Sequence, residues 1–307
     1  MSMTKIYLMQ ALAPTHVGTG RGVGYIDLPI QREKLTNWPL IPGSAFKGVW
    51  SDACRQELPP NDPRLKAAFG KAADSGQDSS AGSLIPTDAR LVALPIRSYH
   101  GTFAWCASPM VLRLLHRDLT LAGLNDLPTA PHGVKSPMAH VAEGSALAPD
   151  GAVYLEDLDF KATPCPTATA WAEAIGSWYF PDEADAGWRK ALRDRFVVVA
   201  DDIFDYLALT GTEVATRVRI NDDTKTVEDG ALWTEESIPA ETLLAGTILC
   251  DRVYHRSGDD TRGAVPTVEE LIESFATRPR QLQIGGKASV GRGRVRVTFM
   301  DVAGGKR

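Results

Sequence analysis

Apolar positions recur with the period of a helix in some segments of this chain and with the period of a strand in others. Helical spacing is clearest over residues 44–58, where apolar side chains at intervals of one and four predict a single buried stripe. Ser44 stands where a side chain can cap the first turn of this helix. Further helices are expected over residues 109–121, 167–179, 188–195, 201–209 and 268–276.

Short apolar runs between these helices predict strands. Residues 6–13 end at Pro14 and are typical of a strand buried on both faces. The other expected strands are residues 84–96, 154–160, 196–199, 243–253 and 294–301. Because strands and helices follow one another along the whole chain, the pattern favours an α+β or α/β fold.

The clearest hairpin begins at residue 213. Residues 213–220 alternate apolar and polar side chains, Asn221-Asp222-Asp223 is a turn sequence, and a return arm is expected within residues 230–239.

Two other segments are predicted to be irregular. Residues 70–83 are rich in Gly, Ser and Asp, and residues 125–150 contain four prolines, which is typical of an inserted excursion.

Composition narrows the possible functions. The chain has 307 residues, which allows one large domain with insertions or two modest ones, and 33 Lys and Arg against 38 Asp and Glu give a net charge of -5. An acidic molecule weakly repels nucleic acid, so any RNA binding must be local. Widely spaced cysteines argue against a zinc site or a disulfide scaffold, and without a signal peptide or a membrane span a cytoplasmic protein is expected.

The basic residues are concentrated near the C-terminus. Residues 278–296 hold six cations and no acid, and they include a glycine-rich loop that leads into a strand. Backbone N–H groups and side chains such as Lys287, Arg292 and Arg294 could together cradle phosphates. A solvated basic turn is the alternative interpretation.

Two residues near the N-terminus could carry chemistry. His16 and Asp27 stand on either side of a loop with four glycines in nine residues, 16–24. Asp27 could act as a general base or as a ligand for a hard divalent cation, and His16 as an acid or base near neutral pH. A turn-capping Asp and a hydrogen-bonded structural His explain the same residues without any catalysis.

The return arm of the hairpin is acidic. Glu228, Asp229, Glu235 and Glu236 lie close to Trp233. A solvated acidic face is the simplest interpretation, with metal binding, a protein partner or the chemistry itself as alternatives. Trp233 could stack on a base, a contact that contributes about 1 to 3 kcal/mol, or it could belong to the core.

Taken together, four segments resemble a known family. Residues 16–33, 37–50, 216–239 and 285–297 are similar in content and order to the RAMP superfamily, and more narrowly to the repeating backbone subunit of type III-B CRISPR effector (Cmr) complexes. The resemblance implies one RAMP-type domain over residues 1–307: an α+β, modified ferredoxin-like (RRM-like) palm with a protruding β-hairpin thumb at about 213–240. The irregular insertion would lie at about 123–150.

The resemblance also implies partners and an activity. Copies would stack head to tail on a guide CRISPR RNA beside other subunits, and each thumb would displace one nucleotide of the guide–target duplex. Asp27 matches the position of the aspartate that cleaves the target RNA, and His16 matches a nearby histidine. We expect a divalent metal ion, Mg or Mn, and products with a 2',3'-cyclic phosphate. The expected RNA-binding residues are Lys47, Lys287, Arg292, Arg294, Arg219 and Trp233.

Two questions stay open at this point. The chain could instead be a non-catalytic RNA-binding scaffold of the same complex, with Asp27 merely capping a turn. An enzyme that processes the guide precursor is disfavoured, because no pair of histidines or His/Tyr site is apparent. Whether His16, Glu235 or Glu236 takes part in cleavage does not follow from the sequence.

Overall fold

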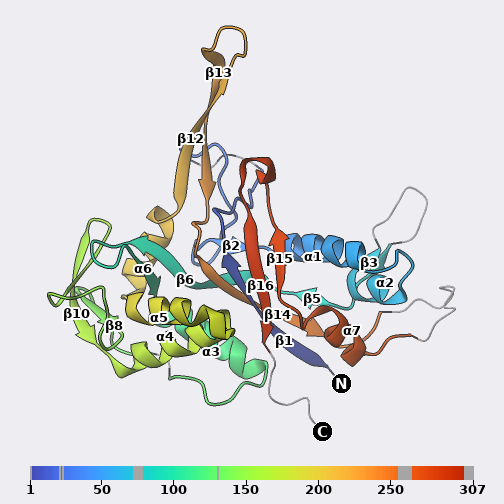
Figure 1. Cartoon of the computed structure of the whole chain (residues 1–307), viewed down its shortest axis with the longest axis horizontal. Coiled ribbons are helices and arrows are strands. Elements are labelled where there is room, and N and C mark those ends of the chain that lie inside the picture. The colour runs from blue at the N-terminus through green and yellow to red at the C-terminus, as the bar shows by residue number, and fades with distance from the viewer. Residues whose placement is uncertain are drawn as a thin grey trace.

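A computed structural model describes residues 2–20, 22, 24–71, 79–129, 131–254 and 265–300. These residues form a mixed α+β structure built on one large, mostly antiparallel sheet in the order β15-β16-β1-β14-β6-β7-β11-β8-β10-β9. One long hairpin projects from the body (Figure 1). The two interior segments predicted to be irregular both contain short strands, and residues 72–78 and 130 lie outside the described part.

Four strands form the centre of the sheet. β1 (Met3–Ala11) lies between β14 (Leu243–Cys250) and β16 (Arg294–Met300), and it pairs antiparallel with both. β14 in turn pairs antiparallel with β6 (Ala89–Arg97). From Lys5 onward every residue of β1 is buried, which confirms a strand covered on both faces.

Two helices connect these four strands. α1 (Gly43–Glu57) lies between β1 and β6 in the chain, and α7 (Val268–Phe275) lies between β14 and β16. In the sheet, β14 lies between β1 and β6, and β1 lies between β14 and β16. The two β–α–β units are therefore interleaved. Two shorter strands extend this part: β15 (Arg280–Gln283) pairs with β16, and β2 (Leu40–Ile41) pairs with β6.

The helix α1 begins one residue earlier than its sequence suggests. Pro42 occupies the N-cap position, and the Gly43 N–H donates to Asp88 Oδ1 at 2.8 Å, so the predicted Ser44 cap is wrong. A Cβ on Gly43 would stand 2.3 Å from the carbonyl oxygen of Pro86, and this close approach requires glycine. The predicted stripe is confirmed, since Phe46, Trp50 and Cys54 are buried.

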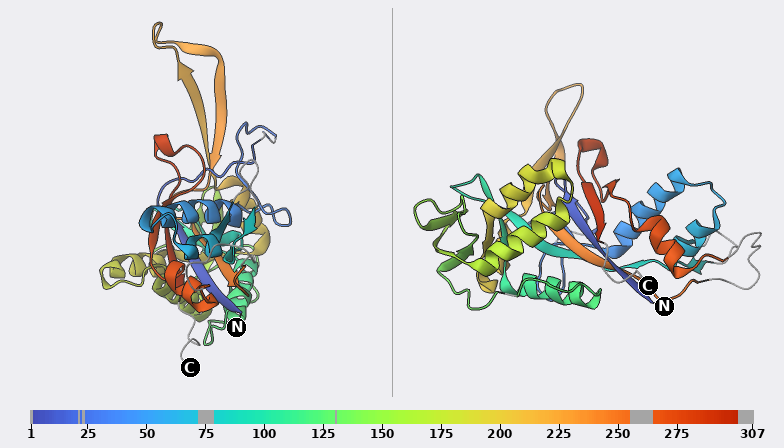
Figure 2. Two further views of the ribbon diagram at one scale, coloured as in Figure 1. Left: turned by 90° about the vertical axis from the view of Figure 1, so that its right-hand side faces the viewer. Right: turned by 60° about the horizontal axis from the view of Figure 1, so that its bottom comes forward.

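The rest of the sheet continues from β6 through five strands. They are β7 (Phe103–Ala107), β11 (Phe196–Val198), β8 (Met138–Val141), β10 (Leu158–Pro164) and β9 (Ala152–Leu155). Four helices pack around this part: α3 (Pro109–Leu121), α4 (Pro166–Tyr179), α5 (Ala186–Arg195) and α6 (Asp201–Thr210). Figure 2 shows that these helices lie at the opposite end of the molecule from α1, α7 and α2 (Pro63–Phe69).

Two expectations about this region need correction, and one strand was missed. The single strand expected over 154–160 is wrong, because Glu156 turns the chain at a φ of 49° and divides it between β9 and β10. Residues 123–129 and 131–150 are irregular except for β8, which is an interior strand of the sheet. The strand β7 was not predicted at all. Its five residues carry no alternation, since four of them are buried.

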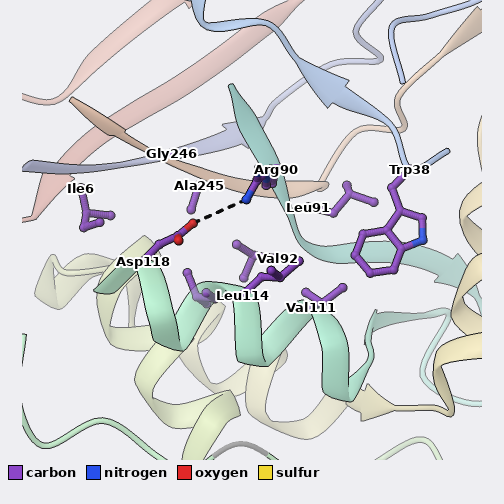
Figure 3. Close-up of a pocket in the computed structure, with 11 residues that line it drawn as sticks. Ile6, Trp38, Arg90, Leu91, Val92, Val111, Leu114, Asp118, Ala245 and Gly246 are labelled. Atoms are coloured by element: carbon purple, nitrogen blue, oxygen red, sulfur yellow. Dashed lines mark ion pairs between the residues drawn. The ribbon is translucent and has the colours of Figure 1, made fainter. Parts of the chain in front are cut away.

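The helix α3 seals one face of β6 (Figure 3). Val111 and Leu115 pack toward the sheet, and Arg90 on β6 lies 3.9 Å from Asp118 on α3. The gap that remains between them has a volume of about 20 Å³, room for a single water molecule. This interface is therefore part of the core.

The projecting hairpin consists of β12 (Glu213–Ile220) and β13 (Val227–Ser237). Thr216 pairs with Thr234 and Val218 with Leu232, and a bulge follows between Val218 and Ile220. The return arm was expected to begin at residue 230, and it begins three residues earlier. The remaining short elements are β3 (Gly70–Lys71), β4 (Ser80–Ala81), β5 (Ile85–Pro86) and two 3-10 turns, Glu183–Asp185 and Ala288–Val290.

The four cysteines are all free, and Cys54, Cys106 and Cys250 are buried. Burial raises the pKa of Cys54 and of Cys250 to about 11. No helix in the described ranges is long and apolar enough to cross a bilayer.

Candidate functional site

Asp27 lies beside the base of the projecting hairpin. The Leu28 N–H donates to the Thr234 carbonyl oxygen and the Glu236 N–H donates to the Leu28 carbonyl oxygen, both at 3.0 Å. These bonds attach the segment after the glycine-rich loop to the edge of β13 that faces away from β12. Asp27 itself is exposed, so a polymer can reach its carboxylate.

Thr234 holds the Asp27 side chain on one oxygen. The Thr234 N–H donates to Asp27 Oδ2 at 2.7 Å, and the Thr234 hydroxyl lies 2.9 Å from the same oxygen. The Asp27 N–H donates in return to Thr234 Oγ1 at 3.0 Å. The backbone bond and then the hydroxyl bond from Thr234 lower the pKa of Asp27 below its ordinary value. The carboxylate is therefore fully ionised at neutral pH.

His16 lies on the same edge of β13 but is covered. Its Nδ1 is 2.6 Å from the Glu236 carbonyl oxygen, which can only accept, so Nδ1 carries the proton of this bond. Only 7% of the residue is exposed. Asp27 and His16 are thus attached two residues apart on one strand, the first open to solvent and the second buried.

Glu236 is buried and holds this arrangement together. Its Oε1 accepts from Arg32 Nη2 at 2.6 Å and from the Thr212 hydroxyl at 2.8 Å, while Oε2 accepts from the Ile30 N–H at 3.0 Å. Only 2% of Glu236 is exposed. The interpretation of Glu236 as part of a solvated acidic face is wrong, because its charge is compensated inside the protein.

Glu235 is also buried, on the opposite face of the hairpin. Its carboxylate lies 2.7 Å from Lys287 Nζ, 3.5 Å from Arg217 Nε and 2.7 Å from the donor Trp233 Nε1. Burial acts to raise the pKa of Glu235, but the bonds from Lys287 and Trp233 outweigh it and the pKa is lowered. A solvated face is wrong for this residue too. Trp233, which lies at the base of the hairpin, is held by the same cluster, with Lys287 Nζ 5.9 Å from its ring centre.

The C-terminal glycine loop is built against the segment of His16. A Cβ on Gly285, whose φ is 78°, would stand 2.2 Å from the His16 carbonyl oxygen, and the Gly286 N–H donates to that oxygen at 2.9 Å. Arg292 lies 2.8 Å from Glu213. The N–H groups of residues 290–293 also donate to backbone carbonyls, so a ligand here would meet side chains.

The other predicted RNA-binding residues are spread over the molecule. Lys47 is half-buried on α1, and burial lowers its pKa. Arg294 is exposed on β16 and donates to Gln281 Oε1 at 3.0 Å. Arg219 lies farther along the hairpin, 3.5 Å from Glu228. The side chain of Asp229 lies outside the described part of the chain.

One face of the hairpin exposes apolar side chains that sequence reasoning did not single out. Val218 and Leu232 pair across the strands, as do Ile220 and Val227 nearer the tip. Between 45% and 65% of each of these residues is exposed. The alternation in β12 signals this face, since Val218 and Ile220 stand two residues apart. Thr234 follows Leu232 by two residues on the same strand, and its hydroxyl donates a hydrogen bond to Asp27.

The chain alone offers few ligands to a metal ion. No group of three or more His, Cys, Asp and Glu that could hold a cation occurs among the described residues. Mg²⁺ sites that act on phosphates are commonly made from one or two carboxylates together with the substrate's own oxygens. Asp27 fits such a site as a single ligand, because the bonds from Thr234 end on Oδ2.

Comparison with known families identifies the class of protein. The model of the RAMP superfamily matches residues 8–296, nearly the whole chain, and the chain belongs to this superfamily. A protein of Pyrococcus furiosus named CRISPR system Cmr endoribonuclease Cmr4 is 32% identical over 307 residues, which cover 97% of both chains. A protein of Saccharolobus solfataricus named CRISPR system CMR subunit Cmr4 is 22% identical over 98% of this chain and 97% of its own.

Solved structures agree with this assignment. Oligomeric Cmr4 from Pyrococcus furiosus matches with a TM-score of 0.72 and 25% identity, over 98% of this chain and 100% of that one. A chain in the type III-B Cmr-beta complex bound to cognate target RNA matches with a TM-score of 0.68 and 20% identity, over 97% of each. The second match concerns the fold alone.

Proposed function

We propose that this chain is the repeating, guide-RNA-binding backbone subunit of a type III-B (Cmr) CRISPR effector complex and that it cleaves complementary target RNA through Asp27. The Cmr endoribonuclease of Pyrococcus furiosus, 32% identical over almost its entire length, supports the assignment. The observation that carries the proposal is an exposed, ionised carboxylate at the foot of a projecting hairpin. The complex acts in the cytoplasm, where guide and target RNA meet.

The architecture supports this role. The order β16-β1-β14-β6, with antiparallel neighbours and two interleaved β–α–β units, supports the assignment of this part as a ferredoxin-like palm. We assign the hairpin β12–β13 as the thumb, and residues 123–150 as an insertion in a single domain. Copies stack head to tail along the guide, in keeping with the oligomeric state named for the Pyrococcus furiosus relative.

The hairpin suits a wedge between nucleotides. Its apolar pair Val218 and Leu232 is exposed, and burial of such side chains against an unstacked base offsets part of the cost of opening the duplex. Trp233 lies at the base, where Glu235 and Lys287 hold it. We therefore assign the contact with the displaced base to Val218 and Leu232. Trp233 instead stabilises the base of the thumb.

Cleavage would follow from the displaced nucleotide. Once a base leaves the stack, its backbone can bring a ribose 2'-OH in line with the next phosphate, and orientation of this kind supplies several kcal/mol of the barrier. Asp27 Oδ1 takes the 2'-OH proton as the 2'-oxygen attacks phosphorus, the bond from phosphorus to the 5'-oxygen breaks, and the 5'-oxygen takes up a proton from water. The products are a 2',3'-cyclic phosphate and a 5'-OH. His16, being buried, supports the strand instead of meeting the RNA.

In the alternative arrangement, Asp27 Oδ1 would hold a divalent ion, Mg or Mn, together with a phosphate oxygen of the target instead of taking the proton itself. Bound there, it would supply positive charge that offsets the negative charge developing on the phosphate. No second carboxylate of the described residues is needed for this arrangement. The proposal leaves out Glu235 and Glu236 as ligands, because Lys287, Arg217 and Arg32 already compensate their charges.

Phosphate contacts fall to a few separate cations. Base pairing reads the sequence, so the protein needs only contacts to the backbone and a wedge, which suits a chain of net charge -5. Lys47 in the first turns of α1, Arg294 on β16 and Arg219 on the thumb are the candidates. Lys287 and Arg292 are already paired with Glu235 and Glu213. To contact RNA, each must either bind a phosphate in addition to its carboxylate or release the carboxylate.

The decisive experiment is cleavage by a reconstituted complex. Copies of the chain, the partner subunits and a guide RNA are incubated with labelled complementary RNA, with and without Mg²⁺. We expect fragments that differ by one constant length, because each copy contributes one Asp27. Target RNA that is bound but stays intact would instead identify a non-catalytic scaffold.

Lys47→Gln should weaken guide loading in a salt-dependent way. Loss of one phosphate contact per copy reduces the slope of log affinity against log salt by about 0.7 for single-stranded RNA. Filter binding between 50 and 200 mM salt measures this slope. Lys190→Gln, which removes an exposed cation paired with Asp194 on α5, is the matched control. An unchanged slope for Lys47→Gln would show that Lys47 does not contact a phosphate of the guide RNA.

A further inference from the structure

We propose that Thr234 is a positioning residue for target cleavage: it fixes Asp27 through Oδ2 and so presents Oδ1 to the RNA at the foot of the thumb. This inference rests on the proposed role of Asp27. It adds a residue on β13 that contributes its hydroxyl to the geometry of the reaction without contacting the reacting atoms.

The two residues are interlocked in both directions. Thr234 gives its N–H and its hydroxyl to Asp27 Oδ2, at 2.7 and 2.9 Å, and its Oγ1 accepts the Asp27 N–H at 3.0 Å. The other acceptor within reach of the hydroxyl, the carbonyl oxygen of Tyr25, is farther away at 3.3 Å. Hydrogen bonds to a charged acceptor are shorter and stronger than neutral ones, so the hydroxyl favours Asp27.

Asp27 needs such a partner because little else restrains it. Its side chain is exposed, and an exposed carboxylate without fixed partners samples several rotamers. Two bonds after Asp27 fix only the main chain of the segment: the Leu28 N–H donates to the Thr234 carbonyl oxygen, and the Ile30 N–H donates to Glu236 Oε2. Catalytic groups must be held within about 0.5 Å of the productive position, which the Thr234 bonds provide.

The position of Thr234 also links the carboxylate to the wedge. Leu232, the exposed apolar residue of the thumb, stands two residues away on the same strand and on the same face. Successive residues on one face of a strand lie about 7 Å apart. The spacing of Leu232 and Thr234 along β13 would therefore help to set the distance between a displaced nucleotide and the bond that is cut.

The test compares three variants in the complete complex. Thr234→Val removes the hydroxyl but keeps the shape and the N–H bond, and Thr234→Ser keeps the hydroxyl. We expect Thr234→Val to lower the single-turnover cleavage rate by about tenfold or more, with guide and target binding unchanged, and Thr234→Ser to cleave at nearly the normal rate. Thr120→Val on α3, where the hydroxyl bonds only within its own helix, is the control.

Rescue by Thr234→Ser is the readout that a merely structural role of the side chain would not give, because serine restores the hydroxyl without the methyl group. If the added methyl disturbs the hairpin, Thr234→Ala removes the same hydroxyl without bulk and carries the same expectations.

The outcomes separate the two proposals. Wild-type cleavage in Thr234→Val would overturn the positioning role, and so would a Thr234→Ser variant as slow as Thr234→Val. If Asp27→Ala abolishes cleavage while Thr234→Val cleaves normally, only the positioning role fails. If Asp27→Ala itself cleaves normally, the proposed function fails instead.

Discussion

Asp27→Asn should abolish cleavage of the target RNA while the complex still assembles and still binds it. The amide keeps an oxygen that can accept the Thr234 N–H and hydroxyl, so the segment at the foot of the hairpin stays in place. What is lost is the negative charge and the basicity of the side chain. General acid–base catalysis contributes about 10²- to 10⁴-fold, so the rate should fall by at least two orders of magnitude.

Single-turnover kinetics on a labelled target measures this loss, and gel-shift titration measures binding separately. Asp157→Asn is the control, because it changes an exposed carboxylate in the turn between β9 and β10 in the same way. A normal rate for Asp27→Asn would mean that another group performs the reaction. If the reaction requires the carboxylate itself, Asp27→Ala should lower the cleavage rate as much as Asp27→Asn does.

Glu236→Gln should destabilise the folded chain by about 3 kcal/mol or more. The charge of Glu236 is buried against Arg32, and removal of one partner of a buried pair typically costs 3 to 5 kcal/mol because the other charge is left uncompensated. The amide group that replaces Oε1 or Oε2 would also lose an acceptor for Thr212 or Ile30. Chemical denaturation followed by tryptophan fluorescence gives the free energy of unfolding.

A second carboxylate on the same strand provides the comparison. Glu228 pairs with Arg219 on the exposed part of the hairpin, where side chains are 37% and 68% accessible. Surface pairs contribute at most about 1 kcal/mol, so Glu228→Gln should change the unfolding free energy little. Equal effects of the two substitutions would show that Glu236 does not anchor the base of the hairpin.

The sequence was sufficient wherever a local pattern determines the structure. The 3.6-residue period predicted α1 and its buried stripe, and the alternation of Val214, Thr216, Val218 and Ile220 predicted β12. Asp27 was placed on an exposed segment near the glycine-rich loop, and its exposure is confirmed. The predicted chemistry of Asp27 stays a prediction, as do the RNA contacts of Lys47 and Arg294.

The predictions that were wrong concern residues whose partners lie far away in the chain. The first N–H of α1 is capped by Asp88, 45 residues later, so the nearby Ser44 was a misleading signal. Glu236 finds Arg32 at a separation of 204 residues, and nothing in the local sequence distinguishes a buried pair from a solvated carboxylate. The contact between Thr234 and Asp27, 207 residues apart, was missed for the same reason.

The strands at the two ends of the large sheet are short. β15 and β9 each have only four residues, whereas the nine-residue strands β1 and β6 are paired on both sides. A long unpaired edge is a template for aggregation, because a neighbouring molecule can add its own strand there. Short edges offer little such template. The short ends of the sheet therefore limit strand addition between neighbouring molecules of this chain at high local concentration.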